Sequence, residues 1–304
     1  MQDILNGETR GLTTMTEVQA SEHLIPWRMG YVAIDVDDLD EATTAWTTLG
    51  MLEVAERSED AVYLRGGTDH HWIVLHKAEH KAGLRRLAFE VRKREDLDTY
   101  RVRLESEGVA VTEHPGEWTG HAIRFTDPSG YEVELFDAMG NVGIAPTKPW
   151  INPSDLLHAV VGVADLDKSF DFYGRVLGLL ESDRVTDRTI FLRAGNQFHH
   201  ALVLGAGRAE PPFLDHVALH FDDIDDLMRV RQNFIERDAH IDRDLLRHPT
   251  SGSMGFYGKG LPGPATVEFC IDHGKITDPM HRPRSMAPGR WTSNVWRPPV
   301  DLDA

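Results

Sequence analysis

Apolar and amphipathic stretches alternate along the chain in a fixed order. The segment HAVVGV, which begins at His158, is apolar and rich in β-branched residues, as strands are. An Asp-Leu-Asp suited to cap a helix follows, and then DKSFDFYGRVL has apolar residues at 170, 173, 176 and 177, close to helical spacing. Gly178 is placed to end that helix. Short strands come next, so this stretch predicts a βαβββ module.

The order then starts again within the same half of the chain. The strand-like LDHVALHF at 214–221 precedes the amphipathic segment DIDDLMRVRQNFIERD and further short strands. Its acidic start is more typical of a solvated loop and helix beginning than of a calcium loop, because the spaced ligands of a calcium loop are missing. Each half of the chain therefore holds two modules.

The two halves are copies of each other. Residues 49–75, LGMLEVAERSEDAVYLRGGTDHHWIVL, match residues 177–204, LGLLESDRVTDRTIFLRAGNQFHHALVL. The offset between matched positions grows slowly, from 128 for Gly30 and His158 to 134 for Glu134 and Glu268. A nearly constant offset indicates one duplicated domain with small loop insertions. We expect an α+β fold of two tandem domains, each of two βαβββ modules that form an incomplete β-barrel.

The repeat and the turn-forming residues divide the chain. The stretch between the copies is rich in Gly, Pro and Asn, as linkers are, and the tail sets Trp291 and Trp296 among Pro and Arg, which favours an ordered role over the site or against another subunit. We predict a flexible N-terminal arm (1–24), a first domain (25–140), a linker (141–156), a second domain (157–273) and a C-terminal tail (274–304).

Composition narrows the class of function. The formal net charge of the 304 residues is −17, which argues against nucleic acid and anionic membranes as partners. One cysteine, Cys270, excludes an internal disulfide and favours a cytoplasmic protein. No apolar run has the length of a membrane span, and the N-terminus lacks the apolar core of a signal peptide.

Three residues in the second half carry candidate chemistry. His158, His216 and Glu268 each lie in the middle of an expected strand, from which a side chain points at whatever the curved sheet encloses. Two imidazoles and one carboxylate on one face of an octahedron are the ligand set of non-haem Fe(II) oxygenases. The alternative is that the three are separate buried polar residues satisfied by hydrogen bonds.

The matched positions in the first half help to decide between a metal site and three separate buried polar residues. At the matched places it has Gly30, Arg86 and Glu134. Because two of the three candidate ligands are replaced there, the fold itself does not require histidine at these positions. We therefore expect a metal site in the second domain and none in the first.

Longer sequence motifs surround the three candidate ligands, which are called the trio below. The segment H-P-T-S-G-S-M-G-F-Y runs from His248 to Tyr257, just before the strand T-V-E-F that holds Glu268. His200 opens the strand H-A-L-V-L, and His216 follows in L-D-H-V-A. In these motifs residues 28–272 resemble a type I extradiol catechol dioxygenase of the vicinal oxygen chelate superfamily.

The resemblance implies an activity and a role for each residue. It implies Fe(II), or Mn(II) in its place, on His158, His216 and Glu268, with O2 as co-substrate. A small aromatic diol would be cleaved beside its hydroxyls (meta-cleavage) to a yellow semialdehyde or keto acid, in aromatic catabolism. His200 would donate a hydrogen bond and then act as general acid, and His248 and Tyr257 would bind the substrate oxygens. Such enzymes form homo-oligomers.

The remaining candidates are expected to be structural. His199 should face away from His200 along its strand, and the first half repeats the pair as His70-His71 without a metal trio. His220 lies too far along the strand from His216 to share an ion. Cys270 is expected in the core. His273 and His281 are expected at the surface.

Two other functions remain open. A 4-hydroxyphenylpyruvate dioxygenase-like enzyme would also hold two such domains and a His-His-Glu site, but it lacks the His-to-Tyr motif that spans 248–257. A non-catalytic protein of this superfamily could use the barrel to bind an aromatic molecule.

Overall fold

The computed structural model describes residues 24–144, 146, 151, 153–207, 213–289 and 292–297. Apart from Leu24, the predicted N-terminal arm falls outside these residues, as does Trp291. The last strand of the first copy ends at Phe136 and the first strand of the second copy begins at Asp155. The domain limits at 140 and 157 stay predictions.

Each half contains two βαβββ modules. The first half holds β1 (Arg28–Val36), α1 (Leu39–Thr48), β2 (Glu53–Arg57), β3 (Ala61–Arg65), β4 (Ile73–Lys77), β5 (Gly83–Glu90), α2 (Arg94–Ser106), β6 (Thr112–His114), β7 (Ala122–Thr126) and β8 (Glu132–Phe136). The second holds β9 (Asp155–Val163), α3 (Leu166–Asp171), η1 (Phe172–Val176), β10 (Leu180–Val185), β11 (Thr189–Arg193), β12 (Leu202–Ala206), β13 (Leu214–His220), α4 (Ile224–Glu236), β14 (Ile241–Arg247), β15 (Met254–Gly258), β16 (Thr266–Ile271) and β17 (Arg284–Met286).

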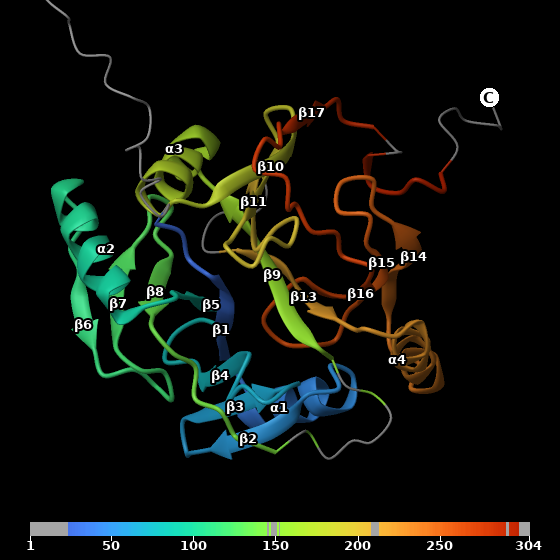
Figure 1. The fold of residues 1–304 in the computed structure, drawn as a ribbon. Coiled ribbons are helices and arrows are strands. Elements are labelled where there is room, and N and C mark those ends of the chain that lie inside the picture. Colours follow the sequence, from blue (N-terminus) through green and yellow to red (C-terminus); the bar gives the residue numbers. More distant parts are fainter. Residues whose placement is uncertain are drawn as a thin grey trace, which may run out of the picture.

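The strands form two open sheets. Their orders are β2-β3-β4-β1-β5-β8-β7-β6 and β14-β15-β16-β13-β9-β12-β11-β10-β17. In each sheet the first strands of two modules, β1 with β5 and β9 with β13, pair antiparallel at the centre. The helices lie at the periphery of the molecule (Figure 1). The predicted α+β fold with incomplete barrels is confirmed.

The helices begin and end where their sequences indicate. Asp38 caps α1 and Asp165 caps α3 by accepting backbone N–H groups of the first turn. The segment expected as one helix is α-helical only to Asp171 and continues as the wider turn η1. It ends before Gly178, whose φ of 84° is the left-handed conformation expected of a helix-ending glycine.

The strand register corrects one sequence match. Tyr31 pairs with Ala88 in β1–β5, as His158 pairs with Ala218 in β9–β13. The residue before each, Gly30 in the first half, lies at a bulge in the register. Tyr31, at an offset of 127, is therefore the counterpart of His158, and the match to Gly30 was wrong by one residue.

One apolar core runs through both halves. It includes side chains from all four modules, such as Trp46 of α1 and Phe234 of α4. The Trp46 indole donates to the Pro262 carbonyl at 3.0 Å, and the Tyr100 hydroxyl donates to the Leu177 carbonyl at 2.9 Å. The two sheets are therefore packed as one body, in which each half supplies surface that the other buries.

The tail follows the second sheet. The strand β17 pairs in parallel with β10, with Arg284 opposite Asp183. Further along, the Val295 N–H donates to the Arg247 carbonyl. The tail therefore contains a strand, β17, whose three residues are too few to leave a periodic pattern in the sequence.

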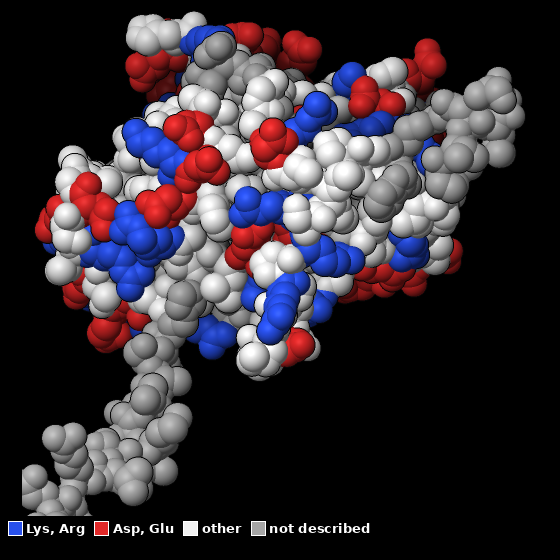
Figure 2. Space-filling model, turned by 90° about the horizontal axis from the view of Figure 1, so that it is seen from above, with Lys and Arg blue, Asp and Glu red and all other residues white. Residues whose placement is uncertain are grey.

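The surface seen in Figure 2 mixes charges of both signs, with blue and red side chains interspersed over this face. Within the part of the chain that the structure describes, the helices do not combine the length and apolarity that a membrane crossing requires.

We expect Tyr131→Phe to weaken the packing of the two halves. The buried Tyr131 hydroxyl accepts from the Phe213 N–H at 2.9 Å and donates to the Gly162 carbonyl. Without the hydroxyl, both backbone groups lose this hydrogen-bond partner. The free energy of unfolding, measured by denaturant titration, should therefore fall by about 1–3 kcal/mol. Val102→Ala, at a side chain that is 67% exposed, is the control and should stay within about 0.5 kcal/mol of wild type. Equal stability of the two variants would contradict this account.

Candidate metal centre and its pocket

Neighbouring strands bring the three candidate ligands together. His158 comes from β9, His216 from β13 and Glu268 from β16, which lie side by side in the second sheet. The two Nε2 atoms are 3.4 Å apart, and Glu268 Oε2 lies 3.2 Å from His158 Nε2 and 3.4 Å from His216 Nε2. All three side chains are buried.

These distances fit one divalent ion. Ligand atoms at about 2.1 Å from a metal lie ~3.0 Å apart in adjacent octahedral positions and ~3.4 Å apart in a tetrahedron. The observed spacings of 3.2–3.4 Å fall in that range. In addition, Glu268 Oε1 makes no hydrogen bond within the described chain, although it is buried. A buried oxygen with spare acceptor capacity beside two imidazoles is the donor set that a cation would satisfy.

The electrostatics of the three residues suit a cation as well. Burial would raise the pKa of Glu268, but the neighbouring imidazoles of His158, His216 and His248 outweigh this effect and hold the pKa well below its ordinary value. Burial lowers the pKa of His158, which keeps its imidazole neutral. Asp215 Oδ1 lies 2.6 Å from His216 Nδ1 and so directs His216 Nε2 toward the site.

The other predicted site residues surround a cavity of about 370 Å³ next to the trio. His200, His248 and Tyr257 line it, together with His216 and Glu268. His248 Nε2 is 2.8 Å from the Tyr257 hydroxyl and 3.5 Å from Glu268 Oε1. Of the six predicted site residues, five line the cavity, and the sixth, His158, is buried behind its wall at 1% exposure.

Apolar side chains and the tail complete the cavity wall. Val160, Val185, Phe191 and Val203 form an apolar side. Arg188 and Arg243 add positive charge, and the Arg243 guanidinium lies 3.5 Å from the centre of the Tyr257 ring. Pro288, Gly289, Thr292 and Ser293 of the tail line a further part of the cavity. A small, flat molecule with polar groups at one edge suits these walls.

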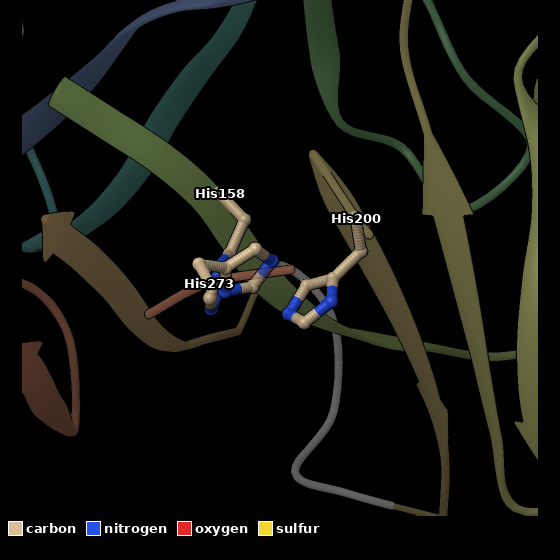
Figure 3. Close-up of side chains that lie close together, drawn as sticks. All are labelled: His158, His200 and His273. Carbon is tan, nitrogen blue, oxygen red and sulfur yellow. The ribbon is translucent and has the colours of Figure 1, made fainter. Parts of the chain in front are cut away.

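His273 does not lie at the surface, as the sequence suggested. The strand β16 ends at Ile271, and Asp272 has a φ of 59°, which turns the chain back toward the sheet. Gly274 then donates to the Ser251 carbonyl, which fixes the turn. His273 is 5% exposed, and its ring lies with those of His158 and His200, as Figure 3 shows. The three form a second group of ligand atoms within 4.8 Å of one another.

Two further histidines, His281 and His199, make hydrogen bonds within the fold. His281 is partly buried and its Nε2 bonds to the Ser182 carbonyl at 2.7 Å, so it is not a free surface residue. His199 is buried beside His200 and bonds to Asp183. The sequence missed Asp183 and Asp215. Asp215 is signalled only by its place next to His216, and Asp183 by nothing local.

The first half holds a different group at the matched place. The strand register matches Tyr31, Arg86 and Glu134 to the trio. Arg86 Nη1 donates to the Tyr31 hydroxyl, which donates to Glu134 Oε1, both at 3.0 Å. Arg124, the counterpart of Tyr257, donates to Glu134 Oε2 at 2.6 Å. Two guanidinium groups thus compensate the buried carboxylate.

The sequence and the fold define a superfamily. Residues 28–135 and 155–280 match the family described as Glyoxalase/Bleomycin resistance protein/Dioxygenase superfamily. The chain belongs to that superfamily.

Relatives and solved structures are named mainly as dioxygenases. The manganese-dependent 2,3-dihydroxybiphenyl 1,2-dioxygenase of Geobacillus genomosp. 3 is 23% identical over 280 residues, which cover 84% of this chain and 88% of the relative. The 3-methylcatechol 2,3-dioxygenase of Pseudomonas putida is 24% identical over 281 residues, with 81% and 89% covered. The resemblance noted in the sequence is therefore confirmed.

Two solved structures share the fold. A Mn(II)-bound glyoxalase from Novosphingobium aromaticivorans superposes with a TM-score of 0.80 at 23% identity, over 90% of this chain and 91% of that one. Homoprotocatechuate 2,3-dioxygenase from Brevibacterium fuscum, in complex with 3,4-dihydroxyphenylacetate, superposes with a TM-score of 0.79 at 23% identity, over 94% of each chain.

We expect His216→Ala to abolish binding of a divalent metal, because the two remaining side chains hold an ion weakly. The metal content of purified protein, measured by inductively coupled plasma mass spectrometry after reconstitution, should fall to near zero. His220→Ala is the control, since His220 lies on the same strand but bonds to the Ser154 hydroxyl. Full metal content in His216→Ala would contradict the assignment.

Proposed function

We propose that this protein is an extradiol dioxygenase, an oxidoreductase that uses a divalent metal and O2 to open the ring of a small aromatic diol. The observation that carries the proposal is the meeting of His158, His216 and Glu268 at 3.2–3.4 Å beside a cavity lined by His200, His248 and Tyr257. Relatives and neighbours whose names state a catechol substrate support it. We propose Fe(II) as the metal, with Mn(II) as the alternative.

His158, His216 and Glu268 would hold the ion beside the cavity. A bound ion would supply Lewis-acid charge that favours the ionised form of the diol, and positions where diol and O2 meet. Val160, Phe191 and Val203 would pack against the ring and exclude water from it. The first half, where Arg86 and Arg124 compensate Glu134, would carry no metal.

His200, His248 and Tyr257 would handle protons and oxygens. The buried Tyr257 has a pKa raised well above its ordinary value by burial and by Glu268, so its hydroxyl stays protonated and can donate to a substrate oxygen. His248, 2.8 Å from that hydroxyl, would orient it and the neighbouring substrate oxygen. His200 would exchange a proton with the reacting oxygens during cleavage. Assembly into homo-oligomers stays an expectation.

Reconstitution separates this function from its alternatives. The protein is loaded with Fe(II) without air, given a panel of mono- and bicyclic catechols, and then exposed to O2. We expect O2 uptake and a yellow product that absorbs in the near-ultraviolet to visible range. Homogentisate formed from 4-hydroxyphenylpyruvate would instead support the keto-acid oxygenase, and tight binding of catechols without O2 uptake would support a binding protein.

We expect His200→Asn to keep the metal and to lower kcat by ~10²–10⁴, as loss of an acid–base group does. The matched control is His71→Asn in the first half, where the residue pairs with His70 as His200 pairs with His199. That variant should retain wild-type kcat, since the described residues at the matched place in the first half are Tyr31, Arg86 and Glu134. An unchanged kcat in His200→Asn would remove the residue from the reaction.

A further inference from the structure

A chain of hydrogen bonds leads from the tail to the cavity through buried side chains. His200 Nδ1 lies 2.9 Å from His199 Nδ1, and His199 Nε2 lies 2.9 Å from Asp183 Oδ2. Arg284 of β17 then holds Asp183, donating to Oδ1 through its backbone N–H at 2.8 Å and through Nε at 3.0 Å, and to Oδ2 through Nη2.

The donors and acceptors along this chain determine which ring nitrogen of each histidine carries a proton. Asp183 is fully buried, and burial would raise its pKa, but the hydrogen bonds from His199 and Arg284 outweigh this and lower the pKa below its ordinary value. The carboxylate therefore only accepts, so His199 carries its proton on Nε2. Burial lowers the pKa of His199, which keeps it neutral and leaves its Nδ1 bare. His200 must then donate from its own Nδ1.

We infer that Asp183 and His199, locked by Arg284 of the tail, are positioning residues that impose one tautomer on His200. This inference rests on the proposed function and adds residues to it. With its proton on Nδ1, neutral His200 leaves Nε2 unprotonated as the nitrogen available to the cavity. It therefore accepts a proton from the bound diol before it returns one, whereas the sequence had suggested that His200 donates first.

The first half supplies the comparison. There His70 and His71 pair through Nδ1 atoms 3.1 Å apart, but the carboxylate behind them is Glu56, which is 3.5 Å from His70 Nε2 and has a side chain 40% exposed. The structure records no arginine on Glu56 among the described residues. A histidine pair alone is thus part of the duplicated fold, while the buried carboxylate with its guanidinium belongs to the half that faces the cavity.

Asp183→Asn provides the test, because the amide reverses the chain. Two of the donors from Arg284 meet Oδ1, so the amide oxygen takes that place and the NH2 group turns to His199. His199 then carries its proton on Nδ1, and His200 carries its proton on Nε2. In full-length protein loaded with diamagnetic Zn(II), 15N spectra of the ring nitrogens should show this exchange of tautomer. With Fe(II), kcat should fall by ~10–100-fold at unchanged metal content, as for other residues that orient catalytic groups.

Two further variants serve as a matched control and as a second test of the same hydrogen bonds. Glu56→Gln, the equivalent change in the first half, should leave the His200 spectrum and kcat as in wild type. Arg284→Gln, at a side chain that is 54% exposed, covers the case in which Asp183→Asn fails to fold. It should give His200 signals from both tautomers and a smaller loss of kcat. A wild-type His200 spectrum in both Asp183→Asn and Arg284→Gln overturns the inference. If the variants shift the His200 tautomer as described but the wild-type protein cleaves no catechol, the proposed function alone is overturned.

Discussion

The buried carboxylate of Glu268 is the constraint around which the second half is organised. A charge that is removed from water must be compensated nearby, because its desolvation would otherwise destabilise the fold by several kcal/mol. Here two imidazoles lie within 3.4 Å of one carboxylate oxygen, while the other oxygen makes no hydrogen bond within the described chain. The compensation offered by neutral imidazoles is incomplete, and a divalent cation would complete it.

The duplicated half solves the same problem with protein groups alone. Glu134 is equally buried, but Arg124 and Arg86 lie beside it and the Tyr31 hydroxyl donates to it. The two halves thus share a backbone and a carboxylate and differ in the groups beside it, which are guanidinium groups in the first half and imidazoles in the second. The fold accommodates either set of groups around the buried carboxylate.

The sequence predicted what periodicity and motif spacing can carry. Four modules, their helix caps and the convergence of His158, His216 and Glu268 all follow from patterns visible in the chain. What it missed depends on backbone detail without a local signature. The bulge at Gly30 shifted the match to Tyr31 by one residue, and the left-handed turn at Asp272 reversed the direction of His273. Asp183 meets His199 only because β10 and β12 both pair with β11.

The shared core has a consequence for how this duplicated chain can change over time. Trp46 of the first half is fully buried and bonds to Pro262 of the second. Because each copy supplies such surfaces to the other, the first copy can differ at the positions of the candidate ligands and still serve as scaffold. Such a copy is free to vary at its own centre while its outer faces stay constrained by its neighbour. A gene fragment that encodes only the second half would therefore retain His158, His216 and Glu268 without the partner surface that supports their strands.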